Sequence, residues 1–110
     1  MAISSEFLNY VLEQLSTLQG VSSRRMFGGV GLYCDGVIFG LIAGDVLYFK
    51  ANGANRADYE SRGMGQFRPF KDKPKLSMSY YEVPADVLED RDECATWARR
   101  YIFAAGRDTQ

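Results

Sequence analysis

The side chains that could do chemistry in this 110-residue chain are carboxylates, thiols and cations, because it contains no histidine. Without an imidazole there is no histidine for general acid–base catalysis, for a serine–histidine pair or for a metal site. The densest group of carboxylates consists of Asp86, Glu89, Asp90, Asp92 and Glu93. We interpret this group as helix capping and a solvated helix face, because a metal site would need converging ligands from elsewhere in the chain.

Two further groups resemble reactive motifs only in part. Cys34 and Cys94 lie far apart and lack metal-ligand spacing, so we expect reduced, inert thiols, with a disulfide as the alternative. The carboxylate of Asp35, next to Cys34, opposes formation of a thiolate. Gly28-Gly29-Val30-Gly31 would cradle a phosphate only if a helix followed, whereas a strand follows. The sequence therefore predicts no metal and no cofactor, and a bend or bulge at these glycines.

A set of cations is the one indication of an anion-binding surface. Its members are Arg24, Arg25, Lys50, Arg68, Lys71, Lys73 and Lys75. Neighbouring residues of a strand point to opposite faces, so either Arg24 or Arg25 should lie over a helix layer, with its stem buried and its head paired. If the other cations gather among Tyr33, Tyr48, Tyr80 or Tyr81, the surface would suit single-stranded nucleic acid. We favour the alternative, in which aromatic rings pack across strands and stabilise the sheet.

An antiparallel meander between Arg24 and Lys50 should position these residues. Asp35-Gly36 separates two apolar runs and indicates a hairpin, because a type I′ turn needs positive φ at both central residues. Ala43-Gly44-Asp45 separates the second run from a third, and both loops are too short for a crossover helix. The predicted strands cover 22–27, 30–34, 37–43 and 46–51.

Two features of these strands predict how they pack. In the strand 46–51, Leu47, Phe49 and Ala51 share the more apolar face, which we place toward the core. Gly31 and Gly40 lie inside strands, where a missing side chain often marks a bulge or the close approach of another element.

Helices and weaker strands surround the meander. An apolar stripe predicts a helix from Ser4 or Ser5 to a left-handed cap at Gly20. A short helix over 56–61 should be capped by Asn55, and a longer one should run from Asp86 to Gly106. The Asp86 helix should begin with a capping box closed three residues later. The stretch 66–70 is an edge strand or an extended loop, and 76–83 is a last strand.

The resulting order, α-β-β-β-β-α-β-β-α, predicts an α+β fold with two layers, in which helices pack on one face of an antiparallel sheet. The length predicts a single domain over 1–110. A net charge of −1 and 46% hydrophobic residues indicate a globular chain without general attraction to nucleic acid or anionic membranes. We expect no signal peptide and no membrane segment, since no apolar run approaches the ~20 residues that span a bilayer.

Several stretches together resemble the N-terminal domain of the TfoX/Sxy family. They are RRMFGGVGLY at 24–33, Asp35-Gly36, DVLYFK at 45–50, MSYYEVP at 78–84 and Trp97-Ala98. The similarity runs from about Phe7 to about Tyr101.

This resemblance implies a compact domain like the secretion-chaperone-type folds, in a cytoplasmic bacterial protein. The best-known members regulate competence genes with a cyclic-AMP receptor protein at promoters, so the implied partner is such a regulator or RNA polymerase. Those members carry a second, helix-hairpin-helix-like domain, which we expect to be absent from this chain, and whether regulatory activity survives without it is left open by the sequence. The family offers no catalytic residues. Its signature carries over as a candidate binding surface of Arg24, Arg25, Met26, Phe27, Gly28, Gly29, Tyr33, Lys50 and Arg68.

Three hypotheses remain open on the sequence. The leading one is a non-enzymatic regulatory or protein-interaction domain in transcription control, and an exposed edge strand would also permit a homodimer. The alternative is a nucleic-acid-binding module, whose salt-dependent binding Arg24→Ala or Arg68→Ala should weaken. A small-molecule-binding enzyme, with a pocket lined by Arg25 and Tyr33, is the third.

Overall fold

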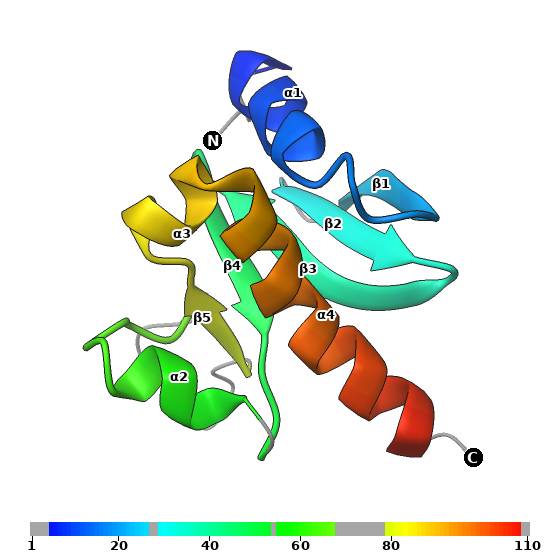
Figure 1. Ribbon diagram of the computed structural model, residues 1–110. Helices are drawn as coiled ribbons and strands as arrows, with labels where there is room; N and C mark the ends of the chain where they lie inside the picture. Colours follow the sequence, from blue (N-terminus) through cyan, green and yellow to red (C-terminus); the bar gives the residue numbers. More distant parts are fainter. Residues whose placement is uncertain (1–4, 27–28, 54, 68–78, 109–110) are drawn as a thin grey trace.

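A five-stranded antiparallel sheet with helices on one face forms the protein (Figure 1). The computed structural model describes residues 5–26, 29–53, 55–67 and 79–108. Neighbours in sequence are neighbours in the sheet, in the order β1-β2-β3-β4-β5. The elements are α1 (Ser5–Gln14), β1 (Val21–Met26), β2 (Gly29–Cys34), β3 (Val37–Ala43), β4 (Val46–Lys50), α2 (Arg56–Glu60), β5 (Tyr80–Glu82), α3 (Ala85–Glu89) and α4 (Arg91–Asp108). The predicted α+β fold and its central meander are confirmed.

The two predicted turns of the meander have the backbone conformation that their residues favour. Asp35 and Gly36 have φ values of 50° and 86°, and Gly44 and Asp45 have values of 57° and 58°. Positive φ at both central residues matches the right-handed twist of the flanking strands. These local signals fix the register in which β2 pairs with β3, and β3 with β4.

A bulge in β3 explains why one of the strand glycines is needed. Leu32 pairs with Gly40 while Tyr33 pairs with Ile38, so Phe39 is the extra residue of β3. A Cβ atom at Gly40 would lie 2.9 Å from the carbonyl oxygen of Tyr48. Close approach of β4 therefore requires glycine here, as predicted.

Alternation along the strands sends one row of side chains into the core. Leu47 and Phe49 of β4 are buried, together with Ala51 just beyond it, which confirms the predicted face. α1, α3 and α4 lie across this face of the sheet (Figure 1), and we name the opposite side the outer face. Other buried residues of the core are Val11, Leu15, Val30, Leu32, Phe39, Ile42, Tyr59, Tyr81, Val87, Cys94, Trp97 and Ala98.

α1 packs through the predicted apolar stripe, with one polar residue included. Val11 and Leu15 are fully buried. Gln14 is also buried, and its Nε2 donates a hydrogen bond of 2.8 Å to the carbonyl oxygen of Leu88. The polar group is satisfied, so it ties α1 to α3 without the cost of an unpaired donor. α1 ends at Gln14, well before Gly20, so the prediction that Gly20 caps this helix is wrong, although Gly20 does have a positive φ of 81°.

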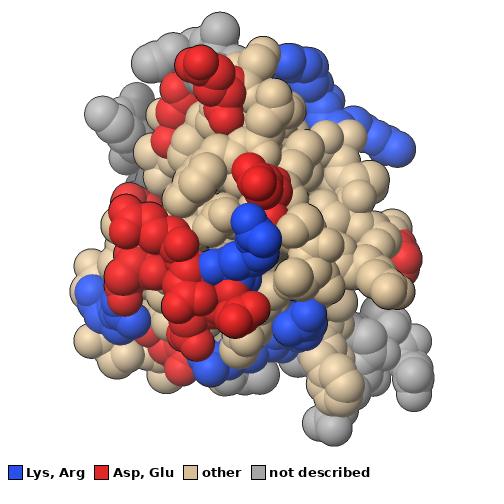
Figure 2. Space-filling model, turned by 45° about the horizontal axis from the view of Figure 1, so that its top comes forward, with Lys and Arg blue, Asp and Glu red and all other residues tan. Residues whose placement is uncertain are grey.

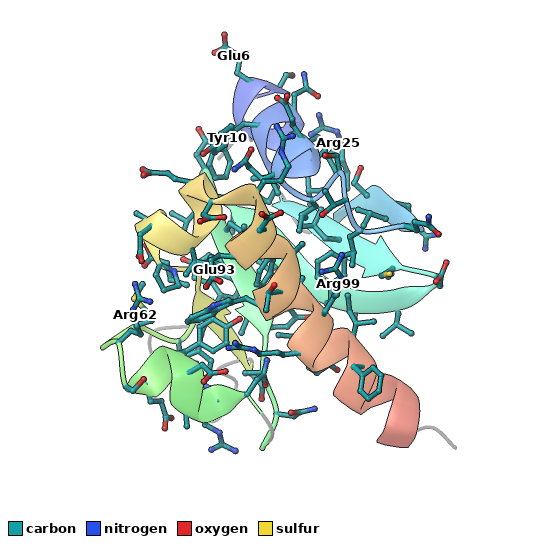
Figure 3. The ribbon with its side chains drawn as sticks, viewed as in Figure 1. Glu6, Tyr10, Arg25, Arg62, Glu93 and Arg99 are labelled. Carbon is teal, nitrogen blue, oxygen red and sulfur yellow. The ribbon has the colours of Figure 1, made fainter. Side chains whose placement is uncertain are left out.

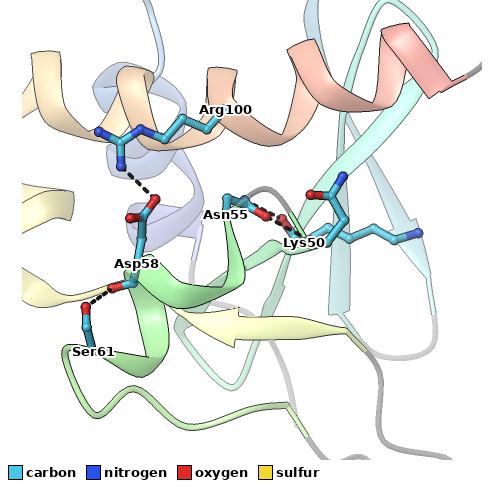
Figure 4. Close-up of polar contacts among 6 residues, drawn as sticks. Lys50, Asn55, Asp58, Ser61 and Arg100 are labelled. Atoms are coloured by element: carbon cyan, nitrogen blue, oxygen red, sulfur yellow. Dashed lines mark hydrogen bonds and ion pairs between the residues drawn. The ribbon is translucent and has the colours of Figure 1, made fainter.

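Asn55 precedes α2 as predicted, but its side chain does not cap the helix. Its Oδ1 accepts a hydrogen bond of 2.8 Å from the backbone N–H of Asn52, and its Nδ2 donates one of 3.4 Å to the carbonyl oxygen of Lys50 (Figure 4). Asn55 is almost fully buried. The side chain therefore joins the end of β4 to α2, which is a tertiary role that helix-capping statistics do not anticipate.

The C-terminal helix begins differently from the prediction. Pro84 precedes α3, and no side chain caps it, so the expected capping box at Asp86 is wrong. The helical conformation is interrupted at Asp90, between α3 and α4. The Oδ1 of Asp90 accepts a hydrogen bond of 3.1 Å from the N–H of Glu93. Asp90 thus caps the second helix, α4, which continues past the expected end at Gly106 to Asp108.

The two weaker strands are shorter than predicted where the structure describes them. Within 66–70, Gln66 forms an isolated bridge with Tyr81, and the N–H of Phe67 donates to the carbonyl oxygen of Tyr80. Residues 68–70 lie outside the described part of the chain. In the predicted strand 76–83, residues 76–78 also lie outside it, and β5 covers only Tyr80–Glu82. The segment around Gln66 therefore borders β5 without forming a full strand.

Candidate functional site

The structure separates the cations that the sequence placed on one candidate surface. Arg24 pairs with Gly31 and Arg25 with Val30, so their side chains point to opposite faces of the sheet, as predicted. Arg25 lies on the helix side, beside α1 in Figure 3. Arg25 is exposed as a residue, and within the described residues it makes no ion pair, so the predicted pairing of its head is not found there.

Arg24 and Tyr33 do come together on the outer face. The guanidinium carbon lies 5.6 Å from the ring centroid, within the range of a cation–π interaction. Gly31, directly opposite Arg24, has no side chain to separate them. The ring is therefore occupied on one side by a cation of the protein itself.

Lys50 lies at the far end of the outer face, at the end of β4. Its Nζ is 5.8 Å from the ring centroid of Tyr80 and 5.9 Å from that of Tyr101. Burial raises the pKa of Tyr80 to about 12, and the nearby Tyr101 and Tyr33 hydroxyls add to the effect. The ring beneath Lys50 thus stays neutral at physiological pH, and the lysine is held by contacts within the domain.

Most of the remaining residues of the predicted surface lie outside the described part of the chain. Gly29 begins β2 and pairs with Met26. Phe27, Gly28 and Arg68 lie outside the described residues, as do Lys71, Lys73 and Lys75. In its described part, the basic surface predicted from the sequence is therefore divided: Arg24 lies over one tyrosine ring, Lys50 lies near two others, and Arg25 is on the opposite face.

Between these contacts the outer face is apolar and aromatic. Leu41 pairs with Tyr48, and the Tyr48 and Phe67 rings lie with centroids 4.8 Å apart. Burial, with a smaller effect of Glu82, raises the pKa of Tyr48. Half-buried residues of this face are Tyr33, Ile38, Leu41, Val46, Tyr48 and Lys50. α1, α3 and α4 lie across the other face of the sheet (Figure 1), and of these helices α4 reaches the outer face at its end, where Tyr101 meets Lys50.

A second aromatic cluster, which the sequence did not reveal, joins α2, β5 and α4. The rings of Tyr59 and Tyr81 are stacked with centroids 5.5 Å apart, and Trp97 meets Tyr59 edge-on at 4.9 Å. The guanidinium carbons of Arg62 and Arg100 lie 5.8 and 5.7 Å from the centroid of the Trp97 ring. The apolar stripe placed Trp97 in the core, but only the fold brings these residues together.

The two arginines of that cluster each form an ion pair with a carboxylate. Arg100 donates to Oδ2 of Asp58 at 2.9 Å (Figure 4), and Arg62 forms an ion pair with Asp86. The hydrogen bond from Arg62 is the main reason that the pKa of Asp86 lies below its usual value. Acidic side chains gather on this side of the molecule, over α3 and the beginning of α4 (Figure 2). This agrees with the interpretation of a solvated, capping group, to which an ion pair is now added.

Both thiols are buried, and they are not paired with each other. The Cys34 thiol donates to the carbonyl oxygen of Gln19 at 3.3 Å. Burial and the neighbouring Asp35 raise the pKa of Cys34, and burial raises that of Cys94 to about 12. Neither thiol is a thiolate at neutral pH, so the prediction that they are poor nucleophiles agrees with their surroundings.

Two kinds of feature are absent from the described residues. No three His, Cys, Asp or Glu side chains there are grouped so that they could hold a metal ion. Among the helices of that part of the chain, none has both the length and the apolar composition to cross a membrane.

Comparison with known proteins identifies the fold family. The family model of the TfoX N-terminal domain matches residues 13–105, which is most of the chain. This chain belongs to the TfoX N-terminal domain family. The family resemblance seen in the sequence is thereby confirmed, and its RRMFGGVGLY stretch includes the end of β1 and most of β2 in this TfoX-type domain.

One curated relative is the DNA transformation protein TfoX1 of Aliivibrio fischeri (strain ATCC 700601 / ES114). It is 30% identical to the chain over 81 residues, which cover 74% of this chain and 37% of the relative. The TfoX-type domain described here thus spans little more than a third of the length of that protein.

Proposed function

We propose that this TfoX-type domain is a non-enzymatic regulatory module that binds another protein and acts in the control of competence genes. The proposal is supported by the surroundings of the thiols and cations of the domain, which are engaged in contacts within it. Both thiols are buried with raised pKa values, and Arg24 and Lys50 are held over tyrosine rings. What the described surface offers instead is an apolar outer face bordered by an exposed edge strand. Such surfaces are suited to contact with a protein rather than to bond making.

The proposed partners rest on the resemblance of the sequence to the TfoX/Sxy family. The relative in Aliivibrio fischeri is named as a DNA transformation protein. We propose a cytoplasmic role in transcription control, with a cyclic-AMP receptor protein or RNA polymerase as the partner. A homodimer is a further proposal that the edge strand allows.

Surface plasmon resonance with the purified chain tests this proposal. The chain should bind immobilised receptor protein or RNA polymerase with a dissociation constant of about 1–100 μM, the range of weak regulatory contacts. Leu41→Asp, which places a charge on the apolar outer face, should abolish binding. Asp92→Asn on α4, on the helix side, is the matched control and should leave it unchanged. Absence of binding to both proteins, combined with turnover of a substrate in an activity screen, would refute the proposal.

Nucleic-acid binding is the second candidate, and the Arg24–Tyr33 and Lys50–Tyr80 contacts are its support. Bases stack on aromatic faces beside cations, although here the protein's own cations already cover these rings. Anisotropy of a labelled single-stranded oligonucleotide should fall with Arg24→Ala and with added salt if this function is real. Arg25→Ala is the control, because Arg25 lies on the opposite face. Equal loss in both variants would show nonspecific attraction only.

A further inference from the structure

The outer edge of β1 is a row of backbone groups that the described residues leave unpaired. Among the strands that the structure describes, β1 is the terminal one of the sheet and pairs only with β2. Its register with β2 is continuous from Val21 to Met26, without a bulge. An unblocked terminal strand can accept a further strand from another chain.

The hydrogen-bond pattern shows which residues of β1 point outward. The N–H of Asp35 donates to the carbonyl oxygen of Gly20 at 3.0 Å, one position before the pair of Val21 with Cys34. Hydrogen-bonded and non-hydrogen-bonded pairs alternate along an antiparallel ladder. Gly20 therefore begins the inward-bonding series, and the N–H and C=O groups of Val21, Ser23 and Arg25 point away from β2.

These outward groups are accessible. Ser22, Ser23, Arg24 and Arg25 are exposed, and Val21 is half-buried. The two serines are too small to shield the backbone, and no proline removes an N–H from this strand. An approaching chain therefore meets donors and acceptors at three alternate positions where no described residue pairs with them.

The charges of β1 specify the chemistry of such a chain. Arg24 points to the outer face and Arg25 to the helix side, next to α1 in Figure 3. Consecutive residues of an added strand also point to opposite faces. Two adjacent carboxylates would therefore place one acid opposite each arginine. Of the described carboxylates, Asp35 lies at the other end of β1, against Gly20, so it does not already neutralise the pair.

We propose that the edge of β1 is a docking site for an extended segment of a partner protein that carries two adjacent acidic residues. The segment adds to the sheet as a sixth strand through the outward groups of Val21, Ser23 and Arg25, and its carboxylates pair with Arg24 and Arg25. The proposal rests on the function proposed above, since it names the surface and the chemistry of the partner of that same domain.

A second copy of the chain fits the edge less well. In an antiparallel pair of β1 strands centred on Ser23, each Arg25 would face a Val21 and each Arg24 a Ser22. No carboxylate would meet either arginine, and four cations would share one interface. Charge complementarity therefore favours an acidic segment over self-association.

Three peptide probes test the proposal with the full chain. Each has eight residues of alternating threonine and valine, with two central glutamates, glutamines or lysines. Fluorescence anisotropy should show binding of the glutamate peptide about tenfold tighter than that of the glutamine peptide, from two cross-strand ion pairs. The lysine peptide should bind more weakly still. Equal affinity for the three peptides, or no binding of the glutamate peptide, would overturn the proposal.

Variants of β1 separate the backbone contact from the charge contact. Ser23→Pro removes an outward N–H without breaking a bond to β2, and it should weaken the glutamate peptide about tenfold. Ser23→Ala retains the N–H and should bind normally. The double variant Arg24→Glu, Arg25→Glu should prefer the lysine peptide. Full binding by Ser23→Pro, verified as folded by circular dichroism, would contradict the proposal, and the charge reversal keeps it testable if that variant does not fold.

Amide hydrogen exchange identifies the occupant. Without peptide, the amides of Val21, Ser23 and Arg25 should exchange fast and those of Ser22 and Arg24 slowly. The glutamate peptide should protect the first three. Protection that grows with protein concentration alone would assign the edge to a second copy, and protection by a single-stranded oligonucleotide would assign it to nucleic acid. Either result would overturn the acidic segment.

Failure of this inference is distinguishable from failure of the proposed function. If the receptor protein or RNA polymerase binds the wild type and Ser23→Pro equally well, the domain is an interaction module that uses another surface. If the peptide binds at β1 but neither protein does, the docking chemistry stands and the assigned partners are wrong.

Discussion

The hydroxyl group of Tyr59 should make the protein less stable than it would be without it. Tyr59 is fully buried, and within the described structure its hydroxyl oxygen has no hydrogen-bond partner. Burial raises the pKa of this group, with a smaller contribution from Asp58, because the charged form has no solvation there. In the unfolded chain the same hydroxyl is hydrated, so folding removes its hydrogen bonds with water and replaces none of them.

The size of the effect follows from that loss. A buried polar group left unpaired costs about 1–3 kcal/mol. Tyr59→Phe removes this cost and retains the ring, which stacks on Tyr81 and meets Trp97 edge-on. Loss of the oxygen's own packing contacts offsets part of the gain. We therefore expect Tyr59→Phe to raise the free energy of unfolding by about 1 kcal/mol, at the low end of that range.

The stacked neighbour provides a matched control of opposite sign. The Tyr81 hydroxyl donates a hydrogen bond of 2.9 Å to Oε2 of Glu60. Tyr81→Phe makes the same chemical change in a ring 5.5 Å away, but it removes a made bond. Because Glu60 is exposed, we expect a loss of about 1 kcal/mol rather than the larger value of a buried charged bond.

Urea unfolding measures both variants. Trp97 is the one tryptophan of the chain and lies against Tyr59, so its fluorescence reports the cluster, and far-ultraviolet circular dichroism reports the whole fold. Equal slopes of the free energy against urea for all three proteins are needed for the comparison. If Tyr59→Phe is destabilising by 1 kcal/mol or more, the hydroxyl has a partner, such as a buried water, and the reasoning is refuted.

Three further results follow from the structure. Gly40→Ala should lower the free energy of unfolding in urea by about 1–3 kcal/mol, because its Cβ would meet the carbonyl oxygen of Tyr48 at 2.9 Å. Gly53→Ala, with open space around its Cβ, is the control and should change that free energy little. Similar changes in the two variants would contradict the close approach of β4 to Gly40. The free energy of unfolding should fall as pH rises from 9 toward 12, because native Cys94 keeps its proton to about 12 while the unfolded thiol loses it near 9.0. Cys94→Ala should reduce the slope of this free energy against pH by up to about 1.4 kcal/mol per pH unit. An unchanged slope in that variant would show that other groups cause the fall. Ellman's reagent should react with Cys34 and Cys94 only in denaturant, and fast labelling of the native protein would show that a thiol is exposed.

How much of the candidate site the sequence could predict depends on the range of the interactions involved. That Arg24 and Arg25 point to opposite faces follows from strand geometry and needs no tertiary information. That Arg24 reaches Tyr33 depends on the register of β1 with β2 and on a glycine between them, which the fold supplies. The sequence grouped Lys50 with the arginines because all are cations, but two intervening strands separate it from β1.

The two capping patterns at the C-terminal helices show the same division. Asp86 with Glu89, and Asp90 with Glu93, both have the three-residue spacing of a capping box, so spacing could not choose between them. In the structure Arg62, which lies 24 residues away in sequence, engages Asp86, and the chain bends at Asp90. A contact over that distance is invisible to a local pattern.

The sequence by itself determined the turns, the strand faces and the family, because each of these depends on residues close together in the chain. Asp35-Gly36 and Gly44-Asp45 adopt positive φ for reasons contained in the two residues themselves, and the alternation in β4 fixes its buried side. The tertiary structure alone decided the Tyr59–Tyr81–Trp97 cluster and the free edge of β1. Both depend on the order in which strands and helices assemble, and burial and pairing at that level are properties of the whole fold rather than of any segment.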